Sequence, residues 1–239
     1  MRYDVSVIGL YILDVLGRPV TRIPDRGNVE FIEEIRLTVA GTAGGTVVDT
    51  AKLGLKSLAV GAVGDDEKAD WVLLTLNKHG VDTSAMQRLK GVPTSATILN
   101  VRPNGDRPAL HVRGASDHFD VAPGMYGQVF DAPIIHLGGT GLLKKLDGPA
   151  SVTLLKDAKK RGRTVTFDLI AASAETIGIV GQPEVAQHGQ ALCGKGFVQF
   201  DDVHLGQRQA CLGQHLAHRR GRAETHDPGQ HAGGAQGAG

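Results

Sequence analysis

The chain has 239 residues, enough for one large domain or two small ones with a substantial hydrophobic core. Lys and Arg number 26 against 25 Asp and Glu, so the charge balance gives no reason to expect a nucleic acid or a membrane as partner. Two cysteines are too few for a disulfide framework, and Asp4 and Asp14 interrupt the apolar start of the chain. We therefore expect a cytoplasmic protein of the α/β class.

Strands and helices alternate along the first 180 residues. Short β-branched runs predict buried strands, and longer runs with apolar residues at helical spacing, each closed by a glycine, predict helices. This order is typical of a mostly parallel sheet with helices on both faces. The predicted strands are 4–10, 57–64, 133–139 and 164–170, and the predicted helices are 45–54, 66–80 and 148–162.

Two segments do not fit that alternation. Residues 31–39 alternate polar and apolar side chains, and the strands of 95–113 flank an Asn104-Gly105 pair, which is a strong hairpin signal. We expect them to form a small antiparallel sheet, a lid built from about 17–40 and 95–113.

The end of the chain has a different composition. Residues 187–239 hold six of the ten histidines, and little apolar surface offsets the entropy of ordering them. We predict a domain over 1–180 followed by an aberrant or disordered tail over 187–239. A shifted reading frame explains this composition, and a natural disordered extension is the alternative.

The stretch "AGTAGGTVVDTAKLG", from Ala40 to Gly54, is the first candidate site. Gly44 and Gly45 let a ligand approach the backbone at the start of a helix, where amide groups and the helix dipole favour oxygen atoms. Asp49 follows one turn later and could accept hydrogen bonds from hydroxyl groups. On spacing alone, a glycine turn before a helix is the favoured reading.

Asp14 is the second candidate. It follows a predicted strand and stands among Ile12, Leu13, Val15 and Leu16. A carboxylate in apolar surroundings needs a partner, which a polyhydroxylated ligand or a local turn could supply.

Taken together, these segments resemble the ribokinase-like (PfkB) family of carbohydrate kinases over residues 3 to about 177. The family's first signature is two glycines, three variable residues, Asn, one residue and Ala; here it reads "GGTVVDTA", with Asp49 in place of Asn. The matching segments, in order, are "VIGLYILD", "AGGTVVDTAKLG", "VGAVGDDEKAD", "HGVDTSAM", "PTSATILNV" and "VTFDL".

The resemblance implies a three-layer α/β/α fold with a β lid, and ATP-dependent phosphorylation of a sugar or nucleoside hydroxyl with Mg²⁺. It further implies that Asp14, Gly44, Gly45 and Asp49 line the sugar site. Arg113, at the end of the hairpin, would reach a ligand from the lid or remain a solvated charge. A homodimer formed through the lid is also implied.

The family's second signature, with a Gly-Ala-Gly-Asp core that supplies the anion hole and the catalytic base, does not occur in the sequence. The catalytic residues are therefore unknown, and we expect this chain to have little or no phosphotransferase activity. A non-catalytic sugar- or nucleoside-binding module is the alternative. A third reading, a metal site in the tail at His204, Cys211, His215 and His218, matches no common zinc spacing, and we predict no metal site.

Overall fold

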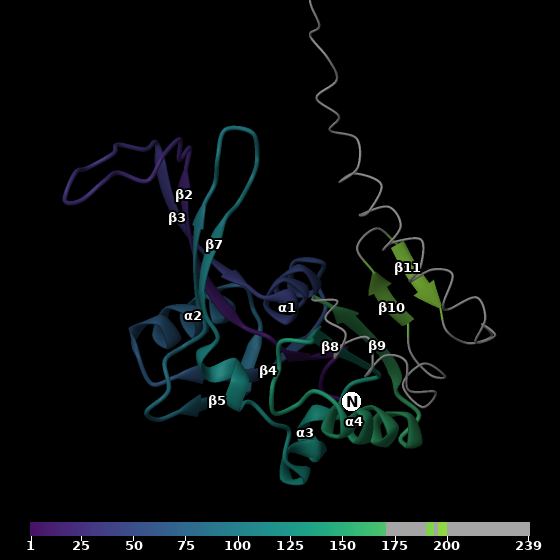
Figure 1. Cartoon of the computed structure of the whole chain (residues 1–239). Helices are drawn as coiled ribbons and strands as arrows, with labels where there is room; N and C mark the ends of the chain where they lie inside the picture. Colours follow the sequence, from purple (N-terminus) through teal and green to yellow (C-terminus); the bar gives the residue numbers. More distant parts are fainter. Residues whose placement is uncertain (171–189, 194–195, 200–239) are drawn as a thin grey trace, which may run out of the picture. The chain divides into compact units, whose positions relative to one another are not determined.

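The computed structural model describes residues 1–170, 190–193 and 196–199, all within a compact unit that runs from Met1 to Asp201. Its main sheet has seven strands in the order β11-β10-β9-β8-β1-β4-β5, and neighbouring strands are parallel except for the β10–β11 pair. Figure 1 shows these strands with their helices. The strands are β1 (Val5–Gly9), β4 (Ser57–Gly64), β5 (Asp82–Leu89), β8 (Ile134–Thr140), β9 (Thr164–Leu169), β10 (Gln190–Cys193) and β11 (Gly196–Gln199).

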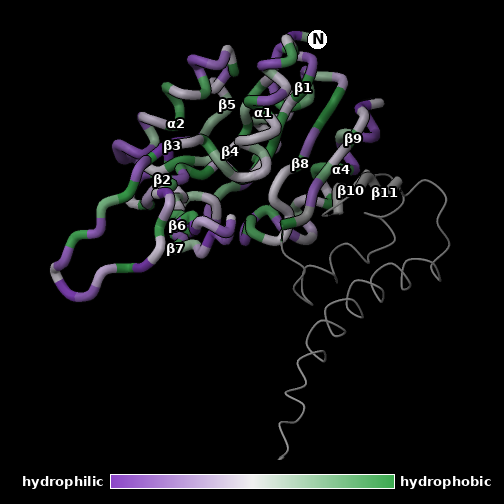
Figure 2. The backbone as a smooth tube through the Cα atoms, turned by 90° about the horizontal axis from the view of Figure 1, so that it is seen from above, coloured by the Kyte–Doolittle hydropathy of each residue, from purple (hydrophilic) through white to green (hydrophobic). Residues whose placement is uncertain are grey.

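Two apolar clusters, one on each face of the sheet, show why this sequence forms three layers. In β1, Val5 and Val7 belong to one cluster and Ile8 to the other, as the two-residue period of a strand requires. Figure 2 shows hydrophobic residues concentrated along the central strands. The first cluster packs against α1 (Thr42–Lys52) and α2 (Glu67–Lys78); the second packs against η1 (Gly114–His118), α3 (Tyr126–Val129) and α4 (Pro149–Lys160), with η2 (Pro123–Met125) preceding α3. The predicted three-layer α/β/α class is confirmed.

The lid is a second sheet of four strands in the order β3-β2-β6-β7, which rises from the α/β body in Figure 1. Its central pair, β2 with β6, is parallel, so our expectation of an antiparallel lid was wrong: the lid is mixed. The physical reason is that the chain enters the lid twice from the same body, and both entering strands run outward. The strands are β2 (Ile12–Arg18), β3 (Glu34–Ala40), β6 (Ala96–Asn100) and β7 (Ala109–Val112).

Some element boundaries differ from the predicted ones. The Asn104-Gly105 hairpin is confirmed between β6 and β7, with Gly105 at φ 87°. Helix α1, however, begins at Thr42 after Gly41 rather than at Gly45, so the predicted glycine loop forms the helix's first turns. Asp14 lies inside β2, a strand that the sequence pattern did not reveal.

The strand order reverses at the centre of the main sheet. From β1 the chain builds outward through β4 and β5, and later through β8 and β9 on the opposite side. Ligands of open α/β sheets bind outside the carboxyl ends of the strands at such a reversal. The fold thus directs attention to the ends of β1 and β8.

Residues 190–193 and 196–199 of the predicted tail form β10 and β11 of the main sheet, and the rest of the tail, with its candidate metal ligands, lies outside the described residues. Among the residues that the structure does describe, no helix is long and apolar enough to cross a membrane. The domain division at 180–187 stays a prediction.

Candidate substrate site

The backbones of β1, β8 and α1 meet closely at the reversal point because glycines stand there. A Cβ on Gly9 would lie 1.9 Å from the carbonyl oxygen of Gly138, and one on Gly138 would lie 2.7 Å from the amide nitrogen of Ala43. Gly41, at φ 81°, would place a Cβ 2.3 Å from the carbonyl oxygen of Leu10. The N-terminus of α1, with its partial positive charge, is thereby packed directly against the carboxyl end of β8.

Three buried oxygen atoms near this point have no hydrogen-bond partner within the described part of the chain: Asp14 Oδ1, Thr42 Oγ1 and Thr140 Oγ1. Thr42 Oγ1 is 3.0 Å from the Cβ position of Gly138, and Thr140 ends β8 two residues later. Buried polar atoms are nearly always hydrogen-bonded, and each unsatisfied one costs about 1–3 kcal/mol. Hydroxyl groups of a ligand are one kind of partner that such oxygen atoms take.

The Asp14 carboxylate is the only charged group among these three. Burial raises its pKa above the ordinary value, while the hydroxyl of Thr97 and the positive charges of His111 and Arg107 partly lower it. On β2, Asp14 follows Ile12 along the same face, and Ile12 packs into the core cluster that contains Leu10 and Leu137. Asp14 is thus placed just beyond the apolar core, on the lid.

Gly44 and Gly45 do not present free amides. The Gly44 N–H donates to the carbonyl of Leu10 at 3.1 Å, and the Gly45 N–H donates to that of Gly41 at 2.9 Å. A Cβ on Gly44 would lie 3.1 Å from Val39, whereas one on Gly45 would meet nothing within 4 Å. Gly44 therefore permits packing between the helix and the lid, and only Gly45 has open space beside it.

We expect Gly45→Ala to raise the melting temperature and to weaken sugar binding. Alanine in a helix is favoured over glycine by about 0.5–1 kcal/mol, while the new methyl group would occupy the open space beside the helix. Thermal denaturation and sugar titration measure the two effects. Gly127→Ala in α3, also with free space, is the matched control and should leave sugar binding unchanged. Unchanged sugar affinity in Gly45→Ala would remove Gly45 from the site.

The other two predicted residues are more exposed. Asp49 lies in the middle of α1 with an exposed side chain, one turn after Gly45 on the same helix face. Arg113 follows β7, and its Nε donates to Asp117 Oδ1 at 2.8 Å. The structure thus places Asp14 and Gly45 near the reversal point, while Arg113 is engaged in a local ion pair. The roles of all five predicted residues remain predictions.

A histidine and an aspartate that the sequence reasoning did not select support the floor of the site. His136 and Asp168 are buried side by side, with Nε2 and Oδ2 3.3 Å apart, and His136 Nδ1 lies 2.9 Å from Thr166 Oγ1. The second Asp168 oxygen accepts the Gly139 N–H at 2.8 Å. This carboxylate fixes the backbone beside Thr140. In the sequence, the only signal for Asp168 was its place in the segment "VTFDL". The only signal for His136 was that it is a polar residue in a predicted apolar strand.

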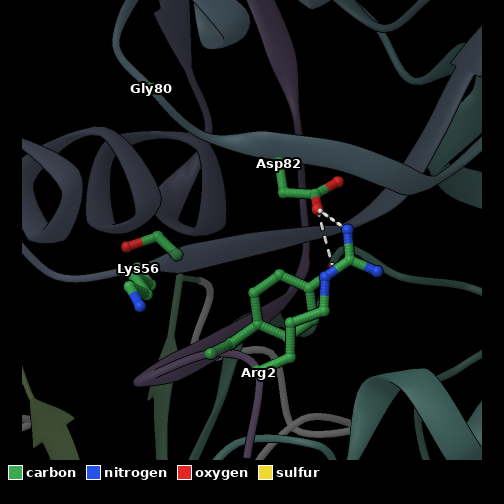
Figure 3. A pocket seen from close by; sticks show the side chains of 6 residues that line it. Arg2, Lys56, Gly80 and Asp82 are labelled. Carbon is green, nitrogen blue, oxygen red and sulfur yellow. Dashed lines mark hydrogen bonds and ion pairs between the residues drawn. The ribbon is translucent and has the colours of Figure 1, made fainter.

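A separate hollow of about 230 Å³ lies at the amino ends of β1, β4 and β5. It is lined by Arg2, Tyr3, Lys56, Ser57, Gly80 and Asp82. In Figure 3 the Arg2 guanidinium points at Asp82, and the two form an ion pair at 3.2 Å. The Tyr3 hydroxyl donates to the same carboxylate at 2.8 Å. Arg2, Tyr3 and Asp82 therefore satisfy one another in this hollow, unlike the unpartnered oxygens of Asp14, Thr42 and Thr140.

Within the described ranges, no three His, Cys, Asp or Glu side chains are grouped as metal ligands would be. None of the described residues is assigned to ATP or Mg²⁺.

Comparison with protein families is consistent with this geometry. The model of the pfkB family carbohydrate kinases matches residues 3–188. This chain belongs to the pfkB family. Among curated relatives, Fructokinase-2 of Solanum lycopersicum is 25% identical over 130 residues, which cover 54% of this chain and 40% of the relative. The 5-dehydro-2-deoxygluconokinase of Geobacillus thermodenitrificans is 25% identical over 169 residues, 70% of this chain and 49% of the relative. The chain thus matches less than half of the length of these kinases.

Solved structures show the same fold as this pfkB chain. Arabidopsis thaliana ribokinase, complexed with ribose and ATP, superimposes with a TM-score of 0.62 and 16% identity, covering 83% of this chain and 78% of the ribokinase. The nucleoside kinase of Methanocaldococcus jannaschii gives 0.59 and 21% identity, covering 79% of this chain and 59% of the kinase. The family resemblance and the ribokinase-like fold predicted from the sequence are confirmed.

Proposed function

We propose that the described residues form the sugar-binding part of an ATP-dependent carbohydrate kinase. The observation that carries the proposal is that three buried oxygens have no partner within the described residues: that of Asp14 on β2, the strand after β1, that of Thr42 at the start of α1, and that of Thr140 at the end of β8. An ionised carboxylate accepts hydrogen bonds from sugar hydroxyls, and the two threonine hydroxyls can donate or accept. Membership in the pfkB family supports a sugar over other polyhydroxylated ligands.

Phosphoryl transfer needs groups that this set of residues does not supply. A γ-phosphoryl donor requires charge stabilisation at its oxygens, and the attacking hydroxyl needs a base or a positioning group. The Gly-Ala-Gly-Asp segment expected in those roles is absent from the sequence. We therefore propose ATP as the family's donor and expect this chain, assayed alone, to bind sugar without turning it over. The two cysteines support a reducing compartment such as the cytoplasm.

The direct test is to titrate the purified chain with fructose, ribose, adenosine and a sugar acid, and to detect binding by ligand-observed NMR. We expect at least one sugar to bind, and we expect that added nucleotide does not displace it. If all four compounds fail to bind to a folded chain, the proposal is overturned. A parallel assay with ATP and Mg²⁺ should show no phosphorylated sugar.

We also propose that the lid forms a homodimer. Leu37, Val15, Ile98 and Leu110 are paired in register across all four lid strands, so they share one face of the sheet. Ile98 and Leu110 are 52% and 66% exposed, and Ile35 and Val112 extend the same face. A continuous exposed apolar face of this kind marks an interaction site, and a second copy offers an identical face at the same concentration.

We expect Leu110→Glu to convert the dimer to a monomer, because a carboxylate on the apolar face would be buried in the dimer without a partner. Sedimentation velocity measures the change. Leu53→Glu, at an exposed leucine beyond the end of α1, is the control and should remain dimeric. A wild-type chain that sediments as a monomer at high concentration would contradict the proposal.

A further inference from the structure

The face of the lid that carries Asp14 also carries a polar row. Register pairs Asp14 of β2 with Thr97 of β6, and Thr97 with His111 of β7. Residues paired in this way point to the same side of a sheet and stand within side-chain reach of each other. The apolar row that includes Val15 and Ile98 occupies the opposite face. One side of the lid is therefore apolar, and the other carries a line of groups that can exchange protons.

The outer contact of this row is short, and the Thr97 hydroxyl also acts on the Asp14 carboxylate. Thr97 Oγ1 and His111 Nδ1 are 3.0 Å apart. Thr97 is buried, His111 is exposed at the outer end of the row, and Asp14 Oδ1 is buried without a partner at the inner end. Arg107, in the hairpin loop before β7, adds a positive charge toward Asp14.

The single proton of the Thr97 hydroxyl decides how the row works. If His111 Nδ1 is unprotonated, it accepts that proton, and Thr97 then offers only lone pairs to the Asp14 carboxylate. If His111 Nδ1 carries hydrogen, it donates to Thr97 Oγ1, and the Thr97 proton becomes available to Asp14. A negative carboxylate beside Thr97 favours the second arrangement.

We infer that His111 is a positioning residue for substrate binding. Through the Nδ1–H···Oγ1 bond it directs the Thr97 hydroxyl at one oxygen of Asp14, and the other carboxylate oxygen remains free to accept from a substrate hydroxyl. This inference rests on the proposed role of Asp14 in binding sugar. His111 itself need not touch the ligand.

The histidine tautomer tests the inference without any ligand. We expect long-range ¹H–¹⁵N spectra of the labelled chain above the His111 titration to show neutral His111 protonated at Nδ1. Thr97→Val keeps the shape of the side chain but removes the bridge, so it should abolish this preference. The exposed His118 in η1 serves as the internal reference. A wild-type His111 protonated at Nε2, with Nδ1 accepting, would overturn the inference.

Sugar titration supplies the second readout. His111→Gln should weaken sugar binding by about three- to tenfold, the effect of one oriented hydrogen bond, while His118→Gln should change nothing. In the double variant with Thr97→Val, the His111 substitution should add no further loss, because both act through one path. If the losses of sugar affinity in the two single variants add up in the double variant, His111 does not act through Thr97. If the wild-type chain binds no sugar, the proposed function fails, and the tautomer spectra still decide the arrangement of the row.

Discussion

Asp14→Asn is expected to weaken sugar binding by about a hundredfold and, at neutral pH, to make the ligand-free chain more stable. The loss of affinity follows from replacing an ionised acceptor, because hydrogen bonds to charged groups contribute about 1.5–3 kcal/mol each. The gain in stability has a separate origin. Burial raises the pKa of Asp14, so the folded chain holds a proton there more tightly than the unfolded chain does.

The raised pKa of Asp14 makes the stability of the fold depend on pH in a definite direction. A carboxyl group with a raised folded pKa stabilises the fold at pH values below that pKa, and this contribution is lost as the pH rises through it. At neutral pH the ionised Asp14 is therefore a cost that Asn does not carry. Paired sugar titration and urea denaturation of both chains measure the two effects. Asp25→Asn, at an exposed aspartate between β2 and β3, is the control for charge alone. A variant that loses both affinity and stability would show that Asp14 is a structural residue.

The second large effect concerns Asp66, which joins the body to the base of the lid. Its side chain caps α2 by accepting the Ala69 N–H at 3.1 Å, and it accepts the Thr94 N–H at 3.0 Å as well as the Thr94 hydroxyl. Thr94 in turn accepts the Gly64 N–H at 2.9 Å. One carboxylate thus holds the end of β4, the start of α2 and the segment that leads into β6.

We expect Asp66→Ala to lower the free energy of unfolding by about 2–4 kcal/mol, through loss of the helix cap and of charge-assisted hydrogen bonds to buried Thr94. Thermal and urea denaturation measure the loss. The control is Asp65→Ala, which removes only the exposed ion pair with Arg88 and should cost less than about 1 kcal/mol. Equal losses in the two variants would contradict the special position of Asp66.

The pH dependence of stability provides an independent check on Asp66. Burial alone would raise its pKa, but hydrogen bonds from Lys68, Thr94 and Ala69 outweigh burial and hold the pKa far below the ordinary value of 3.8. Its stabilising contribution is therefore complete above the unfolded pKa and is lost as the pH falls below about 4. The wild-type chain should lose stability on acidification more steeply than Asp66→Ala does.

Sequence patterns predicted β1, β4, β8 and β9 of the main sheet because buried parallel strands leave strong apolar signals, whereas β10 and β11 fell in the predicted tail. They failed where the signal was weak. Strand β5, "DTSAMQRL", lies at the sheet edge and is largely polar, and β2 follows β1 after only two residues, so both escaped prediction. Helix α1 begins earlier than predicted because glycines, which are poor helix formers, occupy its first turns.

The candidate site was predicted only in part. Asp14 stood out because a carboxylate in an apolar run needs an explanation, and the structure gives it a buried, unpaired oxygen. Thr42 and Thr140 could not be selected from the sequence, since threonine is common and their hydroxyls become notable only when the fold removes every partner. The same holds for His111, whose relation to Asp14 depends on the register of three strands.

The fastening of the lid has a mechanical consequence. At its base, the Leu13 N–H donates to the Ser95 carbonyl, the Ser95 hydroxyl lies 2.6 Å from that of Ser116, and Asp66 holds Thr94. Beyond this line the lid strands are joined mainly to one another. If the lid moves, we expect its hinge near this line, close to Asp14. Movement of the lid would then change the distance between the Asp14 carboxylate and the hydroxyl groups of Thr42 and Thr140, which belong to the α/β body. The site would therefore close on a sugar from two sides.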